Sequence, residues 1–99
     1  MILVRQVFQV KFGQMDKVLA AFTAASEQVQ NSSNISRVLT DISGQNFTLI
    51  LETKAESMDA YWANLQASFQ NSEMAEQMNN LMQYFKSGHK EFFTIEYEA

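Results

Sequence analysis

The sequence predicts a single α+β domain in which helices cover one face of a four-stranded antiparallel sheet. Three observations predict it: period-two segments near both ends of the chain, a hairpin pattern in the middle, and apolar stripes at helical spacing between them. The chain has 99 residues, which is the usual length of one domain, so residues 1–99 are predicted to form one unit. Its 46% hydrophobic and 18% charged residues are typical of a globular protein.

The first strand is predicted over residues 2–12, where side chains alternate between two faces. One face is apolar except at Gln6, and it carries Val4, Phe8, Val10 and Phe12. The other face is mixed and carries Arg5, Val7, Gln9 and Lys11. Gly13 interrupts this alternation, and helical spacing of apolar residues then predicts a helix over residues 15–29. A polar loop is expected over residues 30–34.

A hairpin is predicted over residues 36–53, with its turn at residues 43–46. If opposed residue numbers sum to 89, one face pairs Ile42 with Phe47, Thr40 with Leu49, and Val38 with Leu51. The same register pairs Asp41 with Thr48, Leu39 with Ile50, and Arg37 with Glu52 on the other face. Because a slip of one residue would mix the apolar and polar sets, the pattern itself favours this register.

Two helical stripes follow the hairpin, and Ser57 is the expected N-cap of the first. The first stripe consists of Met58, Tyr61, Trp62, Leu65 and Phe69. After a break at residues 70–72, the second consists of Met74, Met78, Leu81, Met82 and Phe85. Lys86 is expected in the last helical turn and Gly88 at the C-cap.

The last strand is predicted over residues 90–98. Phe93, Ile95 and Tyr97 are expected on the face toward the helices, and Phe92, Thr94, Glu96 and Glu98 on the other. The resulting order is strand, helix, strand, strand, broken helix, strand. This is the βαββαβ order of a ferredoxin-like domain with a broken second helix.

One face of the predicted sheet has no helix to cover it. The helices are expected to pack on Phe8, Val10, Phe12, Val38, Leu49, Leu51 and Ile95. The opposite face is expected to carry Arg5, Val7, Arg37, Leu39, Ile50, Glu52 and Phe92. Since so much apolar area on an open sheet marks a protein contact, the sequence predicts a homodimer through this face.

Composition excludes several classes of function. A net charge of −4 and a pI near 4.8 disfavour binding to nucleic acid or to an anionic membrane. The chain has no Cys and a single His, His89, so we expect neither a metal nor a cofactor. No apolar run approaches a membrane span, and a cytoplasmic location is the default expectation.

Three segments resemble known families. The motif Arg5-x-x-Phe8-x-Val10-x-x-Gly13 resembles the opening of NIPSNAP-family proteins, and residues 91–96 resemble their last strand. Residues 52–62 resemble a strand-to-helix turn that NIPSNAP proteins share with antibiotic-biosynthesis-monooxygenase-like domains. The resemblance implies a dimeric α/β barrel, in which two four-stranded sheets close together. It implies little about chemistry, because that superfamily includes oxygenases, isomerases and haem-degrading enzymes.

A candidate pocket between helix and sheet is formed by Tyr61, Trp62, Phe8 and Tyr97. Plain core packing is the alternative role for these aromatic residues. The resembling haem-degrading enzymes combine a first-strand Asn, a Trp and a helical His, whereas this chain has Gln6 and no His in that helix. His89 is expected at the surface, or as a general base if it faces a cavity.

Two functions are therefore left open. The first is binding of a small apolar or aromatic molecule by a homodimeric barrel without catalytic activity. The second is cofactor-independent oxygenation of an aromatic or quinol substrate.

Overall fold

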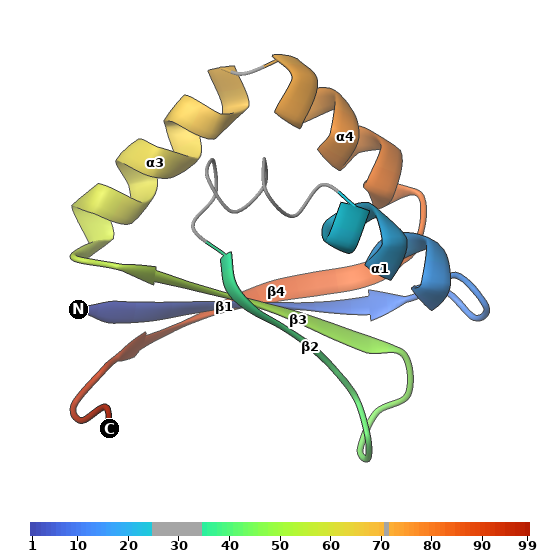
Figure 1. The fold of residues 1–99 in the computed structure, drawn as a ribbon, viewed down its shortest axis with the longest axis horizontal. Coiled ribbons are helices and arrows are strands. Elements are labelled where there is room, and N and C mark those ends of the chain that lie inside the picture. The colour runs from blue at the N-terminus through green and yellow to red at the C-terminus, as the bar shows by residue number, and fades with distance from the viewer. Residues whose placement is uncertain (25–34, 71) are drawn as a thin grey trace.

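The computed structural model describes residues 1–24, 35–70 and 72–99, and it is a two-layer α+β domain (Figure 1). Its elements are β1 (Ile2–Val10), α1 (Met15–Ala24), β2 (Ile35–Thr40), β3 (Thr48–Ala55), α3 (Met58–Gln70), α4 (Ser72–Met82) and β4 (Phe85–Thr94). The described helices all lie on one side of the sheet, and the β2–β3 turn and the C-terminal segment extend beyond its other side (Figure 1). The predicted end of the first helix and the loop after it lie outside the described residues.

The sheet has the strand order β2-β3-β1-β4, and every neighbouring pair is antiparallel. This is the predicted ferredoxin-like topology, with the second helix divided into α3 and α4. The predicted hairpin register is also confirmed over residues 37–40, from the Arg37–Glu52 pair to the Thr40–Leu49 pair. The alternation of apolar and polar residues was sufficient to set this register, because both strands have one distinctly more apolar face.

The hairpin tip and the end of β1 differ from the prediction. Ile42 and Phe47 do not pair in the sheet: Ile42 is fully exposed, and Phe47 adopts a positive φ of 60°. Phe12 was expected in the core, but β1 ends at Val10 and the Phe12 side chain is 83% exposed. The Phe12 ring instead packs edge-on against Phe47, with 5.4 Å between centroids. Two aromatic residues beyond their strands thus shield one another outside the core.

The boundary between α4 and β4 was also predicted wrongly. α4 ends at Met82, so Lys86 and Gly88 lie in β4 and not at a helix C-terminus. The long β1 strand accounts for this, since β4 pairs with it from Ile2–Thr94 to Val10–Phe85. A Cβ atom at Gly88 would lie 2.7 Å from Cδ1 of the Phe8 ring. Close packing against the Phe8 ring therefore explains the glycine at position 88, and a helix C-cap does not.

The two faces of the last strand are exchanged relative to the prediction. β4 ends at Thr94, so Ile95 and Tyr97 lie beyond the strand. Phe92 lies opposite Val4 on the helix side, and Phe93 lies opposite Leu3 on the other side. Both faces of this strand carry an aromatic residue, so alternation alone could not say which face pointed to the core. The register against β1 decides it.

Two buried clusters join the layers. The larger consists of Val10, Val18, Leu49, Leu51 and Leu81. The smaller consists of Val4, Ala55 and Tyr61. α1 and α4 therefore anchor on one half of the sheet and α3 on the other. None of the helices in the described ranges is long and apolar enough to cross a membrane.

Candidate functional site

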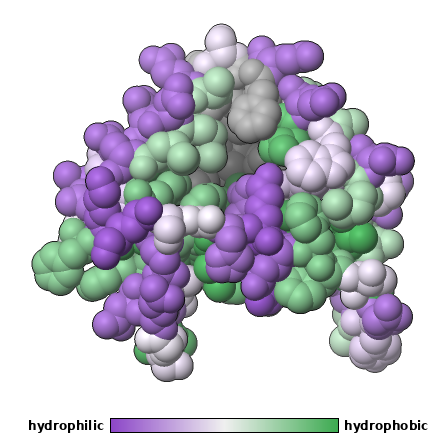
Figure 2. All heavy atoms as spheres, turned by 180° about the vertical axis from the view of Figure 1, so that it is seen from behind, coloured by the Kyte–Doolittle hydropathy of each residue, from purple (hydrophilic) through white to green (hydrophobic). Residues whose placement is uncertain are grey.

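A pocket of about 310 Å³ lies where the end of α4 meets β1 and β4. Among the described residues it is lined by Gln6, Phe8, Met82, Phe85, Lys86, Ser87, Gly88, His89 and Lys90. Phe8 and Phe85 form a stacked pair, with 4.5 Å between centroids and 11° between ring planes. Figure 2, which shows the molecule from behind relative to Figure 1, shows hydrophilic side chains at the centre of this face with hydrophobic side chains on either side.

The absence of a side chain at Gly88 shapes this pocket. Gly88 and Phe8 are opposed in the β1–β4 ladder, and the Phe8 ring occupies the space over Gly88. A side chain at position 88 would displace that ring. The stacked Phe8–Phe85 pair lines the pocket, and it supplies the apolar surface that a ligand would contact.

Lys90 connects the pocket to a group of three aromatic residues, the aromatic corner, formed by Tyr61, Trp62 and Phe92. Lys90 Nζ lies 5.2 Å from the Tyr61 ring centroid and 5.6 Å from that of Trp62. These distances are within the range of cation–π attraction. The Phe92 ring packs edge-on against Tyr61, at 5.6 Å. The ammonium group is thus held against α3 at one side of the pocket.

The structure places the four residues of the predicted pocket in different surroundings. Phe8 lines the pocket, and Tyr61 is buried beside it. The Trp62 side chain is 45% exposed on α3. It is therefore neither fully packed in the core nor enclosed in a pocket. Tyr97 follows the end of β4 and is 86% exposed, so it is not brought together with the others.

Sequence reasoning missed most of the pocket lining. Met82 lies at the end of α4, as the helical stripe predicts, whereas Phe85, Lys86 and Gly88 are predicted as the last helical turn and its cap but lie on β4. The start of β4 was hidden because the helical spacing of apolar residues continues from Met74 to Phe85. The sequence also did not predict the partner of His89. The Nε2 atom of His89 lies 3.3 Å from Oε2 of Glu91. Both are on one side of β4, since residues two apart on a strand share a face.

The second candidate surface is the open face, the side of the sheet away from the described helices. It carries Leu3, Arg5, Val7, Arg37, Leu39, Ile50, Glu52, Lys54, His89, Glu91 and Phe93. Six of the seven residues predicted for this face are present, and Phe92 is the exception. Its side chain is in the aromatic corner instead.

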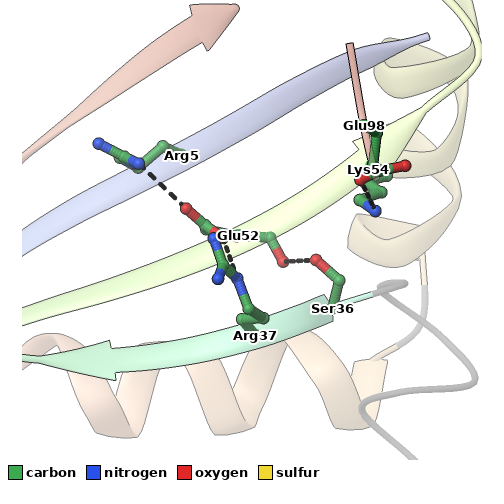
Figure 3. A network of polar contacts seen from close by, with 6 residues as sticks. All are labelled: Arg5, Ser36, Arg37, Glu52, Lys54 and Glu98. Carbon is green, nitrogen blue, oxygen red and sulfur yellow. Dashed lines mark hydrogen bonds and ion pairs between the residues drawn. The ribbon is translucent and has the colours of Figure 1, made fainter. Parts of the chain in front are cut away.

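A row of alternating charges crosses the open face, in the strand order Arg37, Glu52, Arg5 and Glu91. Glu52 is at its centre and only 1% exposed. Arg5 Nη2 donates to Glu52 Oε2 at 3.1 Å, and Arg37 Nε donates to Oε1 at 2.6 Å (Figure 3). One carboxylate therefore binds two guanidinium groups, one through each oxygen.

An apolar row adjoins these charges and contains Leu39, Ile50 and Val7, with His89 at its end. On the other side of the charged row, the Arg5 guanidinium lies 5.5 Å from the Phe93 ring centroid. Lys54 forms an ion pair with Glu98 (Figure 3). The open face thus combines apolar side chains with charges that are paired within the subunit.

Comparison of this structure with solved structures identifies similar folds. An uncharacterized NIPSNAP domain protein from Burkholderia xenovorans has a TM-score of 0.90 and 9% identity, covering 100% of this chain and 98% of that one. A NIPSNAP family protein from Agrobacterium tumefaciens has a TM-score of 0.86 and 13% identity, covering 94% and 90%. The structural neighbours of the present chain thus include NIPSNAP proteins.

A more distant group of neighbours is named for the antibiotic biosynthesis monooxygenases. The Nitrosomonas europaea protein of this group has a TM-score of 0.74 and 11% identity, covering 98% of this chain and 100% of that one. No family model and no curated protein matches the sequence. At such low identities the NIPSNAP-like neighbours establish the fold, and the chemistry must be argued from the residues.

Proposed function

We propose that this protein binds a small apolar or aromatic molecule in the pocket between α4, β1 and β4. The observation that carries the proposal is a pocket of about 310 Å³ with apolar walls from Phe8, Met82 and Phe85. Ligand pockets of proteins typically begin at about this size. The exposed Met82 side chain adds an adaptable wall, because methionine adjusts to ligands of different shape.

A thermal-shift screen tests this function. A panel of small aromatic and aliphatic compounds should contain members that raise the melting temperature, since a ligand that binds only the native state stabilises it. Met82→Trp adds bulk to the pocket wall and should remove the shift. Met58→Trp is the matched control, because Met58 is also exposed but does not line the pocket. A panel without effect, or equal shifts in both variants, would contradict the proposal.

The binding protein is further proposed to be a homodimer joined through its open face. Two observations support this arrangement. The row of Leu39, Ile50 and Val7 presents apolar surface, and the flanking Arg5, Arg37 and Glu52 are already paired, so burying them would leave few uncompensated charges. A second copy related by a two-fold axis would bring the two rows together.

Light scattering measures this assembly directly. At micromolar concentration the mass should be about twice the 11.3 kDa of one chain. A stable homodimer usually buries at least about 1,200 Å² in total, which two four-stranded sheets can supply. A mass near that of one chain would contradict the dimer and leave the ligand proposal standing. The cytoplasmic location stays a prediction of the sequence.

A second candidate function is cofactor-independent oxygenation of an aromatic or quinol substrate. It is favoured by the fold shared with proteins named for monooxygenases, and by the aromatic corner beside the pocket. Such chemistry needs polar groups that stabilise a substrate anion, and Lys86 and Lys90 line the pocket. Oxygen uptake with a panel of phenols and quinols tests it. Uptake no greater than that of a Trp62→Phe variant would contradict it.

A further inference from the structure

The pocket has a charge opposite to that of the protein. The whole chain carries a net charge of −4, yet the described residues of the pocket lining include Lys86 and Lys90 and no carboxylate. The remaining lining is apolar or uncharged. A ligand in this pocket would therefore meet apolar ring surface on one side and ammonium groups on another.

The two lysines of the lining differ from most other cations of the chain. Arg5, Arg37 and Lys54 each form an ion pair with a carboxylate. Lys86 and Lys90 form none with any residue that the structure describes. Lys90 is held in place by the Tyr61 and Trp62 rings, which attract a cation but do not neutralise it. Its positive charge is thus available to a ligand.

From this arrangement we infer that the pocket selects an organic anion, with its apolar body against Phe8 and Phe85 and its carboxylate beside Lys86 and Lys90. The inference rests on the proposed function and adds the chemical class of the ligand. The apolar body gains from leaving water, and the ammonium groups donate hydrogen bonds that only an acceptor at this position can use. A neutral amide of the same shape would keep an acceptor oxygen but lose the attraction between opposite charges.

Two bicyclic probes of nearly equal size separate the contribution of the apolar body from that of the carboxylate. The probes are 2-naphthoate, which carries a carboxylate, and 2-naphthamide, which replaces it by a neutral amide. Isothermal titration at low salt should give tighter binding of 2-naphthoate. Exposed ion pairs contribute up to about 1 kcal/mol, which is roughly a fivefold change in Kd. Lys86→Gln and Lys90→Gln should each weaken the binding of 2-naphthoate by about two- to fivefold and should change the binding of 2-naphthamide less, because its amide carries no charge.

Lys17→Gln is the matched control, because Lys17 Nζ also lies near an aromatic ring, 5.8 Å from the Tyr84 centroid, but does not line the pocket. It should leave the affinity for both probes unchanged. Equal binding of the two probes, or lysine variants without effect on 2-naphthoate, would overturn the anion inference while the pocket itself stands. If Met82→Trp leaves the binding of both probes unchanged, the site is elsewhere and the proposed function fails with it.

Discussion

Glu52 is nearly inaccessible to solvent, although the described helices all lie on the other side of the sheet. Its burial comes from its neighbours, because Arg5 and Arg37 approach from the two adjacent strands. The arginines themselves are partly exposed, at 34% and 63% of the side chain. Solvent therefore screens the guanidinium groups, and the carboxylate carries most of the desolvation.

Glu52→Gln should lower the free energy of unfolding by about 1–2 kcal/mol, because the amide keeps one acceptor oxygen, whereas its NH2 group cannot accept from the second arginine. Urea denaturation followed by circular dichroism measures the change. Glu98→Gln is the control, since it neutralises the exposed partner of Lys54 and should cost less than about 0.5 kcal/mol. Equal effects of the two substitutions would show that the central position of Glu52 confers no particular stability.

Gly88 provides a second test at the scale of single residues. Gly88→Ala should destabilise the fold by roughly 1–2 kcal/mol, since the new Cβ would lie 2.7 Å from the Phe8 ring. In a Phe8→Leu background the same substitution should cost less, because the ring is gone. A double-mutant cycle on urea-unfolding data gives the coupling between positions 8 and 88. Additive effects would mean that ring and backbone do not compete for this space.

At the scale of elements, the sequence predicted the pairing within the hairpin correctly. It did not predict which face of the last strand points toward the helices. The β2–β3 register was predicted correctly because opposed residues differ in polarity, as at Arg37–Glu52 against Val38–Leu51. The β4 strand has adjacent Phe92 and Phe93, so both of its faces looked suitable for the core. Only long-range pairing with β1 distinguishes them. Local patterns cannot encode that information when both faces are aromatic.

The start of α3 was predicted from a local signal, and it supports a test of its own. Ser57 Oγ accepts a hydrogen bond from the Ala60 backbone N–H at 3.1 Å, which confirms it as the N-cap. Ser57→Ala should lower the free energy of unfolding by about 1 kcal/mol, because this N–H loses its partner. Ser57→Asp should retain most of the stability, since a carboxylate also caps and favours the helix dipole. Thermal melts of the three proteins compare them, and equal melting temperatures for Ser57→Ala and wild type would refute the capping role.

The candidate site is a property of the whole molecule, and this explains why it was only partly predicted. Phe8 comes from the first strand, whereas Phe85, Gly88 and Lys90 come from the last, nearly eighty residues later in the chain. Because residues 85–88 are predicted from sequence as the end of a helix, this part of β4 was not assigned to the site. Tyr61 and Trp62 were found because a helical stripe is a local pattern. Their relation to Lys90 depends on how α3 packs across the sheet.

The open face leads to the last prediction. Ile50 lies in the central apolar row, between Leu39 on β2 and Val7 on β1. In a dimer formed through this face, Ile50→Asp would bury a charge without a partner, so the mass measured by light scattering should fall toward 11.3 kDa. Gln66→Glu adds the same charge at an exposed position of α3, and it should leave the mass unchanged. Circular dichroism of each variant reports whether the subunit still folds. A folded Ile50→Asp variant that keeps the wild-type dimer mass would exclude the open face as the interface.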